Sequence, residues 1–246
     1  MNYVLKGIHF LNHVALVVFL LYYQQYWLLC VSFIVYQFLL VVGVSGGLHR
    51  YFTHKSFQTS QSWEKIMLFA SVPATVGTPI GWIGTHRLHH AYSDTEKDPH
   101  SPASIGFLQS YFHIWKPFVI PSNLVKDLMQ NKTAVFIHKR YMELLLGFII
   151  LLYIINPMIG ILVYSIPAVI MFHSTAITNA VNHRVGYRNF ATDDSSTNML
   201  LPGWLIGGEG FHNNHHKNPS SPSFSTKPLE FDLTWQFIKL IRNKND

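Results

Sequence analysis

The sequence has few charged residues and a single cysteine. Charged residues make up 12% of the 246 positions, whereas apolar residues make up 49%. A soluble domain usually has about 25% charged residues, so this shortage indicates a chain that lies largely in a membrane. The cysteine, Cys30, lies in an apolar run and excludes both a disulfide framework and a thiolate metal site. If a metal is bound, nitrogen and oxygen ligands must bind it.

A cleavable signal peptide and a second-domain linker are also missing. The first apolar run is followed almost at once by another, rather than by a small-residue cleavage site. We find no internal repeat, low-complexity tract or linker along the chain. We therefore expect one domain over residues 1–246.

Four apolar segments are candidate membrane spans, since one crossing takes roughly 20 residues. We expect them at about residues 8–23, 26–46, 142–155 and 159–178. Short uncharged turns join them in pairs, which predicts two helical hairpins in an all-α integral membrane protein. The segment at residues 63–82 is also fairly apolar, but prolines and glycines interrupt it. We expect this segment to be a helix that lies in or dips into the membrane interface.

Positive charge is distributed asymmetrically about these spans. All 18 Lys and Arg residues lie before the first hairpin, between the hairpins or after the second. Because positively charged loops stay on the cytoplasmic side, we expect both termini and the long central region to be cytoplasmic. The sites described next would then lie on that side of the membrane.

Histidine is abundant, with 15 copies. In each His-x-x-His-His box, positions three and four apart lie on one helical face and can point into one cavity. His49 and His54 are five residues apart, about 140° around an α-helix, so they converge only if the helix ends between them. Glycines at 43, 46 and 47 make such a break plausible. Nine histidines form four such groups: His49 and His54; His86, His89 and His90; His183; and His212, His215 and His216.

Nine imidazoles at one membrane face exceed the needs of a single metal ion. Neutral imidazole suits Zn, Cu, Fe and Ni, and a tetrahedral zinc ion takes three or four ligands. Two ions with four or five nitrogens each fit the number. We expect the other six histidines to be structural or solvated: His9, His13, His100, His113, His138 and His173.

These boxes, their order and the spans between them resemble the membrane fatty-acid desaturases, in particular the Δ9 branch of acyl-CoA and acyl-lipid enzymes. The likeness runs from about Gly46 to Ile241. It rests on four motifs: GLHRYFTHKSF at 47–57, GTHRLHHAYSDTEKDPHSP at 84–102, NAVNHRVGYR at 179–188 and GEGFHNNHHKNP at 208–219.

The resemblance implies four spans and a helical cytosolic cap that holds two iron ions. The nine histidines would be the ligands, and Asn179, one helical turn before His183, would reach one iron through water. The implied reaction uses O2 and two electrons to take hydrogen from two adjacent methylenes of an acyl-CoA or acyl-lipid, leaving a cis double bond. The protein would position the acyl chain in an apolar tunnel, with Trp82 and Trp204 as candidate lining residues.

Two features depart from the family pattern. Gly84 and Thr85 precede the second box where animal acyl-CoA desaturases carry charged residues, which puts that kind of CoA recognition in doubt. We find no fused cytochrome b5-like or ferredoxin-like domain, so we expect a separate electron donor such as ferredoxin or cytochrome b5. The net charge of +6 would attract an acidic donor, although the positive-inside rule explains it equally well. Membrane lipids are expected partners and nucleic acid is not.

Two other functions stay open. A histidine-box hydroxylase or ketolase of lipids or alkanes would use similar ligands, although the box spacings and the segment Asp98 to His100 favour a desaturase. A metal transporter or sensor is a more distant alternative. Transport predicts ionisable ligands along a path through the bilayer, whereas only His173 lies well within an expected span.

Overall fold

The computed structural model describes residues 3–243. Extended residues in this part of the chain pair only as isolated bridges, such as Tyr187 with Asn198. The expected all-α fold is therefore confirmed for the described residues. The single domain expected over 1–246 stays a prediction, and its residues 1–2 and 244–246 lie outside the described part.

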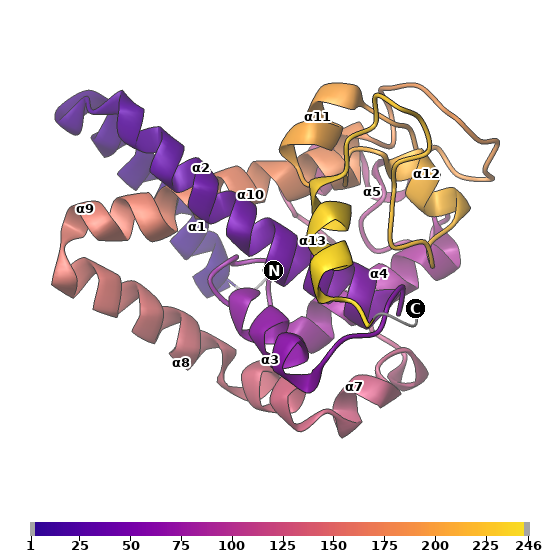
Figure 1. The fold of residues 1–246 in the computed structure, drawn as a ribbon, viewed down its shortest axis with the longest axis horizontal. Helices are drawn as coiled ribbons and strands as arrows, with labels where there is room; N and C mark the ends of the chain where they lie inside the picture. The colour runs from indigo at the N-terminus through magenta and orange to yellow at the C-terminus, as the bar shows by residue number, and fades with distance from the viewer. Residues whose placement is uncertain (1–2, 244–246) are drawn as a thin grey trace.

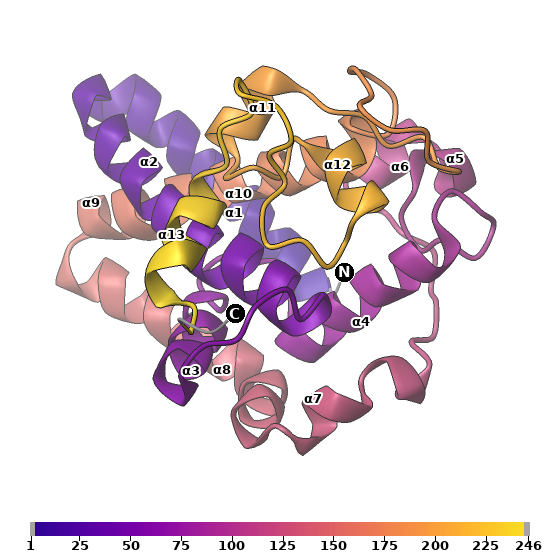
Figure 2. The same cartoon turned by 45° about the vertical axis from the view of Figure 1, so that its right-hand side comes forward.

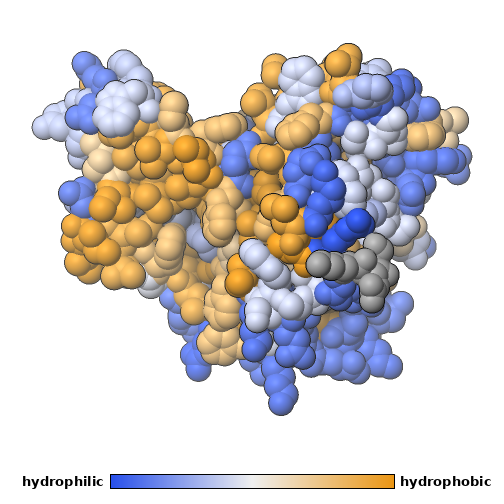
Figure 3. All heavy atoms as spheres, in the orientation of Figure 1, coloured by the Kyte–Doolittle hydropathy of each residue, from blue (hydrophilic) through white to orange (hydrophobic). Residues whose placement is uncertain are grey.

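Long helices and the irregular helical turns that extend them build the apolar end of the molecule (Figure 1). Both α1 and α2 pack against α10. Apolar side chains cover the surface of this end, and hydrophilic side chains gather at the opposite end (Figure 3). The elements are α1 (Tyr3–Val18), π-helical η1 (Phe19–Tyr23), 3-10 helical η2 (Tyr26–Leu28), α2 (Leu29–Phe38), π-helical η3 (Leu39–Thr53), α8 (Lys132–Ile155), α9 (Pro157–Gly160), π-helical η5 (Ile161–Ser165), α10 (Ile166–Ala176) and π-helical η6 (Ile177–Val181).

Three helical stretches in this set are long and apolar enough to cross a membrane. They are Tyr3–Tyr23, Tyr26–Thr53 and Pro157–Val181, which contain the first, second and fourth expected spans. The third expected span, 142–155, forms the second half of α8 and is not one of the three. A fourth span and the arrangement in two hairpins therefore stay predictions.

Shorter helices form the cap, which lies away from the apolar end of the molecule (Figure 2). Helix α4 carries the second histidine box, and α12 carries the third. The cap elements are α3 (Gln61–Ala70), α4 (Pro79–Tyr92), α5 (Pro102–Ile105), α6 (Phe107–Tyr111), 3-10 helical η4 (Ser122–Leu124), α7 (Lys126–Gln130), α11 (Leu200–Leu205), α12 (His212–Lys217) and α13 (Leu233–Ile241).

The segment at residues 63–82 is not one helix, contrary to expectation. Helix α3 ends at Ala70, and α4 begins only at Pro79, where the Thr78 hydroxyl accepts a hydrogen bond from the Gly81 N–H. Proline is well placed at the start of a helix because it has no N–H to leave unpaired. Between the helices, Gly77 adopts a φ of 103°, which few other residues tolerate. The prolines and glycines therefore divide the segment, so the direction of α4 is independent of that of α3.

Helix η3 ends at Thr53, between His49 and His54 as expected, and its π-helical winding brings the two residues together. Its wider winding pairs each N–H with the carbonyl five residues earlier, so residues five apart come to one face. The His54 N–H bonds the His49 carbonyl at 3.2 Å, and the ring centroids lie 5.0 Å apart. The glycines serve packing instead. A Cβ on Gly43 would lie 2.7 Å from the carbonyl carbon of Ala70, so Gly43 lets α3 pack tightly against η3.

A buried arginine ties η3 to the C-terminal part of the chain. Arg50 is fully buried, and its Nη1 donates to Asp232 Oδ1 and to the Pro222 carbonyl, both at 3.0 Å. Its guanidinium also lies 3.8 Å from the ring centroid of Phe224. Since a buried charge is tolerated only when it is paired, these contacts hold the segment after α12 against η3.

Candidate metal centre

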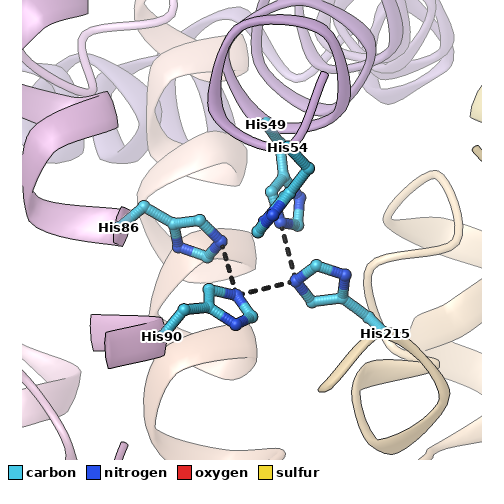
Figure 4. Close-up of side chains that lie close together, drawn as sticks. All are labelled: His49, His54, His86, His90 and His215. Atoms are coloured by element: carbon cyan, nitrogen blue, oxygen red, sulfur yellow. Dashed lines mark hydrogen bonds between the residues drawn. The ribbon is translucent and has the colours of Figure 1, made fainter. Parts of the chain in front are cut away.

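The nine histidines of the four groups meet in two clusters. Within each cluster, every residue offers one ligand atom within 4.8 Å of the others. Figure 4 shows rings of the first cluster, from η3, α4 and α12, pointing toward one another. The first cluster contains His49, His54, His86, His90 and His215, and the second contains His89, His183, His212 and His216.

Each His-x-x-His-His box divides its histidines between the two clusters. In α4, His86 and His90 belong to the first cluster and His89 to the second. In α12 the outer histidines belong to the second cluster, and His215 belongs to the first. Residues four apart share a helix face while the third position is turned away, so each helix serves two neighbouring centres.

Carboxylates fix two rings of the second cluster so that their Nε2 lone pairs face each other. His89 Nδ1 donates to Asp98 Oδ2 and His216 Nδ1 to Asp194 Oδ2, each at 2.7 Å. A neutral ring that donates from Nδ1 has a bare lone pair on Nε2. The two Nε2 atoms lie 3.4 Å apart, and two lone pairs cannot hydrogen-bond each other. A cation bound by both nitrogens resolves this conflict, so the donor set fits a metal ion.

A carboxylate also faces the Nδ1 atom of one further ring in each cluster. His183 Nδ1 lies 3.4 Å from Asp94 Oδ1 and 3.2 Å from Ser195 Oγ. In the first cluster, His49 Nδ1 lies 2.7 Å from Glu209 Oε2. Sequence reasoning did not single out Asp94, Asp194 or Glu209, although each lies within or beside a motif that it quoted.

Burial favours the neutral form of the α12 imidazoles, which is the form that binds metals. Burial, helped by neighbouring rings, lowers the pKa of His212 and His215 well below the ordinary value. Burial also lowers the pKa of His216 to about 4, although its hydrogen bond to Asp194 acts in the opposite direction. His54 Nε2 is buried without a hydrogen-bond partner among the described residues, as suits a ligand atom.

A largely apolar space passes the first cluster. Trp82 and Asn179 line three adjoining cavities, and His49 and His86 line the second of them. Trp82 lines these cavities, and its role beside an acyl chain stays a prediction. Trp204 does not line these cavities, because it is 43% exposed and its indole N–H bonds a loop carbonyl. Asn179 lies beside the cavities in η6, and its water-mediated contact with a metal stays a prediction.

The other histidines lie outside the two clusters. His100 is buried and stacks on His89 with ring centroids 4.4 Å apart. His89, Asp98 and His100 also place ligand atoms close together, but Asp98 already accepts from His89, so His100 packs behind the second cluster. His13 and His173 pair through their Nε2 atoms at 3.2 Å.

Comparison with known proteins decides the family. Residues 8–229 match the family described as fatty acid desaturase. The chain belongs to this family. The resemblance inferred from the four motifs is therefore confirmed, and with it an oxidoreductase class. Members of the family use a di-iron centre and O2, and the two histidine clusters fit this chemistry.

Relatives of this desaturase act on acyl chains that are attached either to a lipid or to coenzyme A. It is 34% identical to the sn-1 stearoyl-lipid 9-desaturase of Anabaena variabilis, over 82% of this chain and 75% of the relative. It is 32% identical to the acyl-CoA C20 Delta5-desaturase of Anemone leveillei, over 89% and 71%. The sn-2 palmitoyl-lipid 9-desaturase of Nostoc sp. (strain 36) is also 32% identical, over 82% and 73%. These relatives imply a fatty-acyl substrate.

Proposed function

We propose that this desaturase introduces a cis double bond at the Δ9 position of an acyl-CoA or acyl-lipid chain, using O2 and two iron ions. The proposal rests mainly on one observation, the largely apolar cavities whose walls include His49 and His86 of the first cluster. An acyl chain in this space would run directly past the metal ligands. Two 9-desaturases among the relatives favour the Δ9 position.

The residues would divide the work as follows. The nine clustered histidines bind the two irons, and Asn179 orients a water toward one of them. When bound, iron supplies the activation of O2 that an unactivated C–H bond requires. Asp98, Asp194 and Glu209 hold the ligand rings in place through Nδ1. Trp82 and its apolar neighbours exclude water and hold one pair of carbons beside the first cluster.

The same proposal includes the placement of the enzyme in the cell. We expect a multi-pass membrane protein with four spans, cytoplasmic termini and a cytoplasmic active site, because the positive charge lies outside the apolar hairpins. Electrons would come from a separate ferredoxin or cytochrome b5, and membrane lipids would surround the spans. The apolar surface covers the end formed by α1, α2 and α9 (Figures 1 and 3), whereas α4 and α12, which carry two of the histidine boxes, lie away from that end.

The test is the fatty-acid profile of a host that expresses the chain, together with one variant for each cluster, His215→Ala and His89→Ala. New cis-monounsaturated acyl chains should appear with the wild type and disappear with both variants. The exposed histidine of α8 offers a matched control, because His138→Ala leaves both clusters intact and should keep activity. The position of the double bond decides whether Δ9 is correct.

Other outcomes would change the conclusion. Oxygenated lipid in place of new double bonds would make the chain a hydroxylase of the same histidine-box type. Absence of iron and of any lipid product, in well-expressed membranes with a supplied electron donor, would contradict the di-iron proposal itself.

A further inference from the structure

The three cavities beside the first cluster adjoin one another and share wall residues. Their volumes are about 130, 40 and 220 Å³. Trp82 and Asn179 line all three, and Trp115 lines the first and the third. The two regions differ in the pairing of their buried polar atoms: among the described residues, the first cavity is lined by side chains with unpaired buried nitrogens and the second is not. We call the second cavity the hydrocarbon end, and the first and third cavities the polar end.

The wall of the hydrocarbon end includes aliphatic Leu40, Val44 and Ile206 beside the metal-cluster residues. Polar side chains of this wall are engaged elsewhere: Ser174, for example, shares a hydrogen bond of 2.7 Å with the buried Tyr36. This end therefore suits the hydrocarbon part of an acyl chain, which offers no polar group.

The polar end contains buried nitrogens that lack a partner among the described residues. They are Trp115 Nε1, His113 Nε2 and His9 Nδ1, and all three side chains line the first cavity. Leaving such a group unpaired costs about 1–3 kcal/mol. Hydrocarbon cannot pair with these atoms, so the bound molecule must bring a polar group to this place.

The unpaired atoms define which polar group fits. An indole N–H only donates, so Trp115 requires an acceptor. Burial lowers the pKa of His113 to about 3, so its ring is neutral and can donate one further N–H. His9 is only 6% exposed and already bonds the Thr75 backbone. A carbonyl oxygen accepts two hydrogen bonds and matches this set.

The charge of the cavity wall and the depth of the cavity in the membrane limit which carrier molecule can bring that carbonyl. No Lys or Arg lines the first or third cavity within the described residues. Coenzyme A carries several phosphates, which are usually bound by cationic side chains. Leu5 and His9 line the first cavity from the start of the first candidate span, Tyr3–Tyr23. The ester groups of bilayer lipids lie at such a depth, where a span enters the headgroup region.

We infer that the polar end binds the ester carbonyl of an uncharged membrane glycerolipid through Trp115 and His113, with its acyl chain running into the hydrocarbon end beside the first cluster. This inference rests on the proposed function and adds a substrate class and a direction of binding. A carbonyl held at one place also fixes which methylenes meet the first cluster. The two donors are thus positioning residues for the site of the double bond.

A binding measurement tests the polar end without turnover. Radiolabelled 1-stearoyl glycerolipid in neutral detergent micelles is titrated onto purified, iron-free protein and separated by equilibrium filtration. Trp115→Phe keeps the ring and removes one donor, which should weaken binding roughly 2- to 12-fold. Trp63→Phe is the matched control, because Trp63 packs on Phe237 away from the cavities, and it should bind as the wild type does. Equal binding by the two variants would overturn the inference.

A turnover measurement separates the two possible carriers. Iron-loaded protein with a reduced electron donor and O2 receives either the stearoyl glycerolipid in neutral vesicles or stearoyl-CoA. The glycerolipid should be the better substrate, and Trp115→Phe should raise its KM while kcat stays close to that of the wild type. If stearoyl-CoA is preferred, the inference is wrong and the desaturase proposal stands. If neither substrate gains a double bond, the proposed function fails, while the binding result still decides the polar end.

Discussion

The two histidine clusters lie side by side but are held in different ways. The second cluster has four imidazoles, and the carboxylates of Asp94, Asp98 and Asp194 face three of them. The first cluster has five imidazoles, and Glu209 is its one carboxylate contact among the described residues. Only the first cluster lines the apolar space. Most rings away from the apolar space are thus oriented by carboxylates, whereas most of those beside it are oriented by packing.

This difference fits the different surroundings of the two clusters. A carboxylate beside an acyl chain would need solvation that the chain cannot provide. Glu209 does line the second cavity, but its carboxylate is engaged with His49 and with Arg50, at 3.8 Å. The first cluster can therefore border hydrocarbon without leaving a charge unpaired. The second cluster, which is away from the apolar space, has no such constraint.

The largest expected effect concerns metal content. The second cluster retains three imidazoles after His212→Ala, whereas the first retains four after His54→Ala. Both variants should lose activity, but His212→Ala should lose its iron more completely, because fewer ligands remain. Iron per chain, measured by atomic absorption on purified protein, checks this. Equal iron loss in the two variants would show that one imidazole of the first cluster other than His54 is not a ligand.

Removal of single carboxylates should come next in size. Loss of a partner that orients a ligand ring typically lowers metal affinity or activity roughly 10- to 100-fold. We expect Glu209→Gln near the upper value, because it removes the one carboxylate of the first cluster. Asp98→Asn should lie near the lower value, because Asp94 and Asp194 still hold their rings. Iron titrations of the two variants measure this, and the reverse order would contradict the comparison.

A change in the hydrocarbon end should alter selectivity without altering iron. Val44 is 4% exposed and lines the second cavity. Val44→Phe fills part of this volume, so the preference should move to shorter acyl chains, on the order of tenfold for two methylenes at about 0.8 kcal/mol each. Competing stearoyl and palmitoyl substrates measure the ratio. Val31→Phe is the control, since Val31 lies on the exposed side of α2, and it should leave the ratio unchanged.

The smallest effect concerns a hydroxyl behind the second cluster. Ser195 Oγ donates to Asp94 Oδ2 at 2.7 Å, and Asp94 faces His183. Ser195→Ala removes one hydrogen bond of about 1 kcal/mol, so iron affinity should fall roughly fivefold. The exposed Ser220 provides a control, because Ser220→Ala should not change the affinity. An unchanged affinity in Ser195→Ala would mean that the backbone N–H of Ser195 holds Asp94 without the hydroxyl.

Local patterns predicted the histidine groups, because the spacing within α4 and α12 is a property of each helix alone. They did not predict which ring joins which cluster, since this depends on how the two helices are turned toward each other. A helix end between His49 and His54 was expected and is present, but the π-helical winding of η3, which also brings residues five apart to one face, was not predicted. Asp94 and Asp194 escaped notice because they lie 100 residues apart and meet only around the second cluster.

The contacts of η3 have a consequence for the order of biosynthesis. His49 meets His215 across 166 residues of chain, and Arg50 meets Asp232 across 182. Neither cluster can therefore exist while the ribosome is still making the chain that follows α11. Metal loading of either cluster would therefore follow translation of α12, which carries residues of both. Until then the nascent protein presents incomplete sets of imidazoles, and a cell that makes it needs to keep other metals from them.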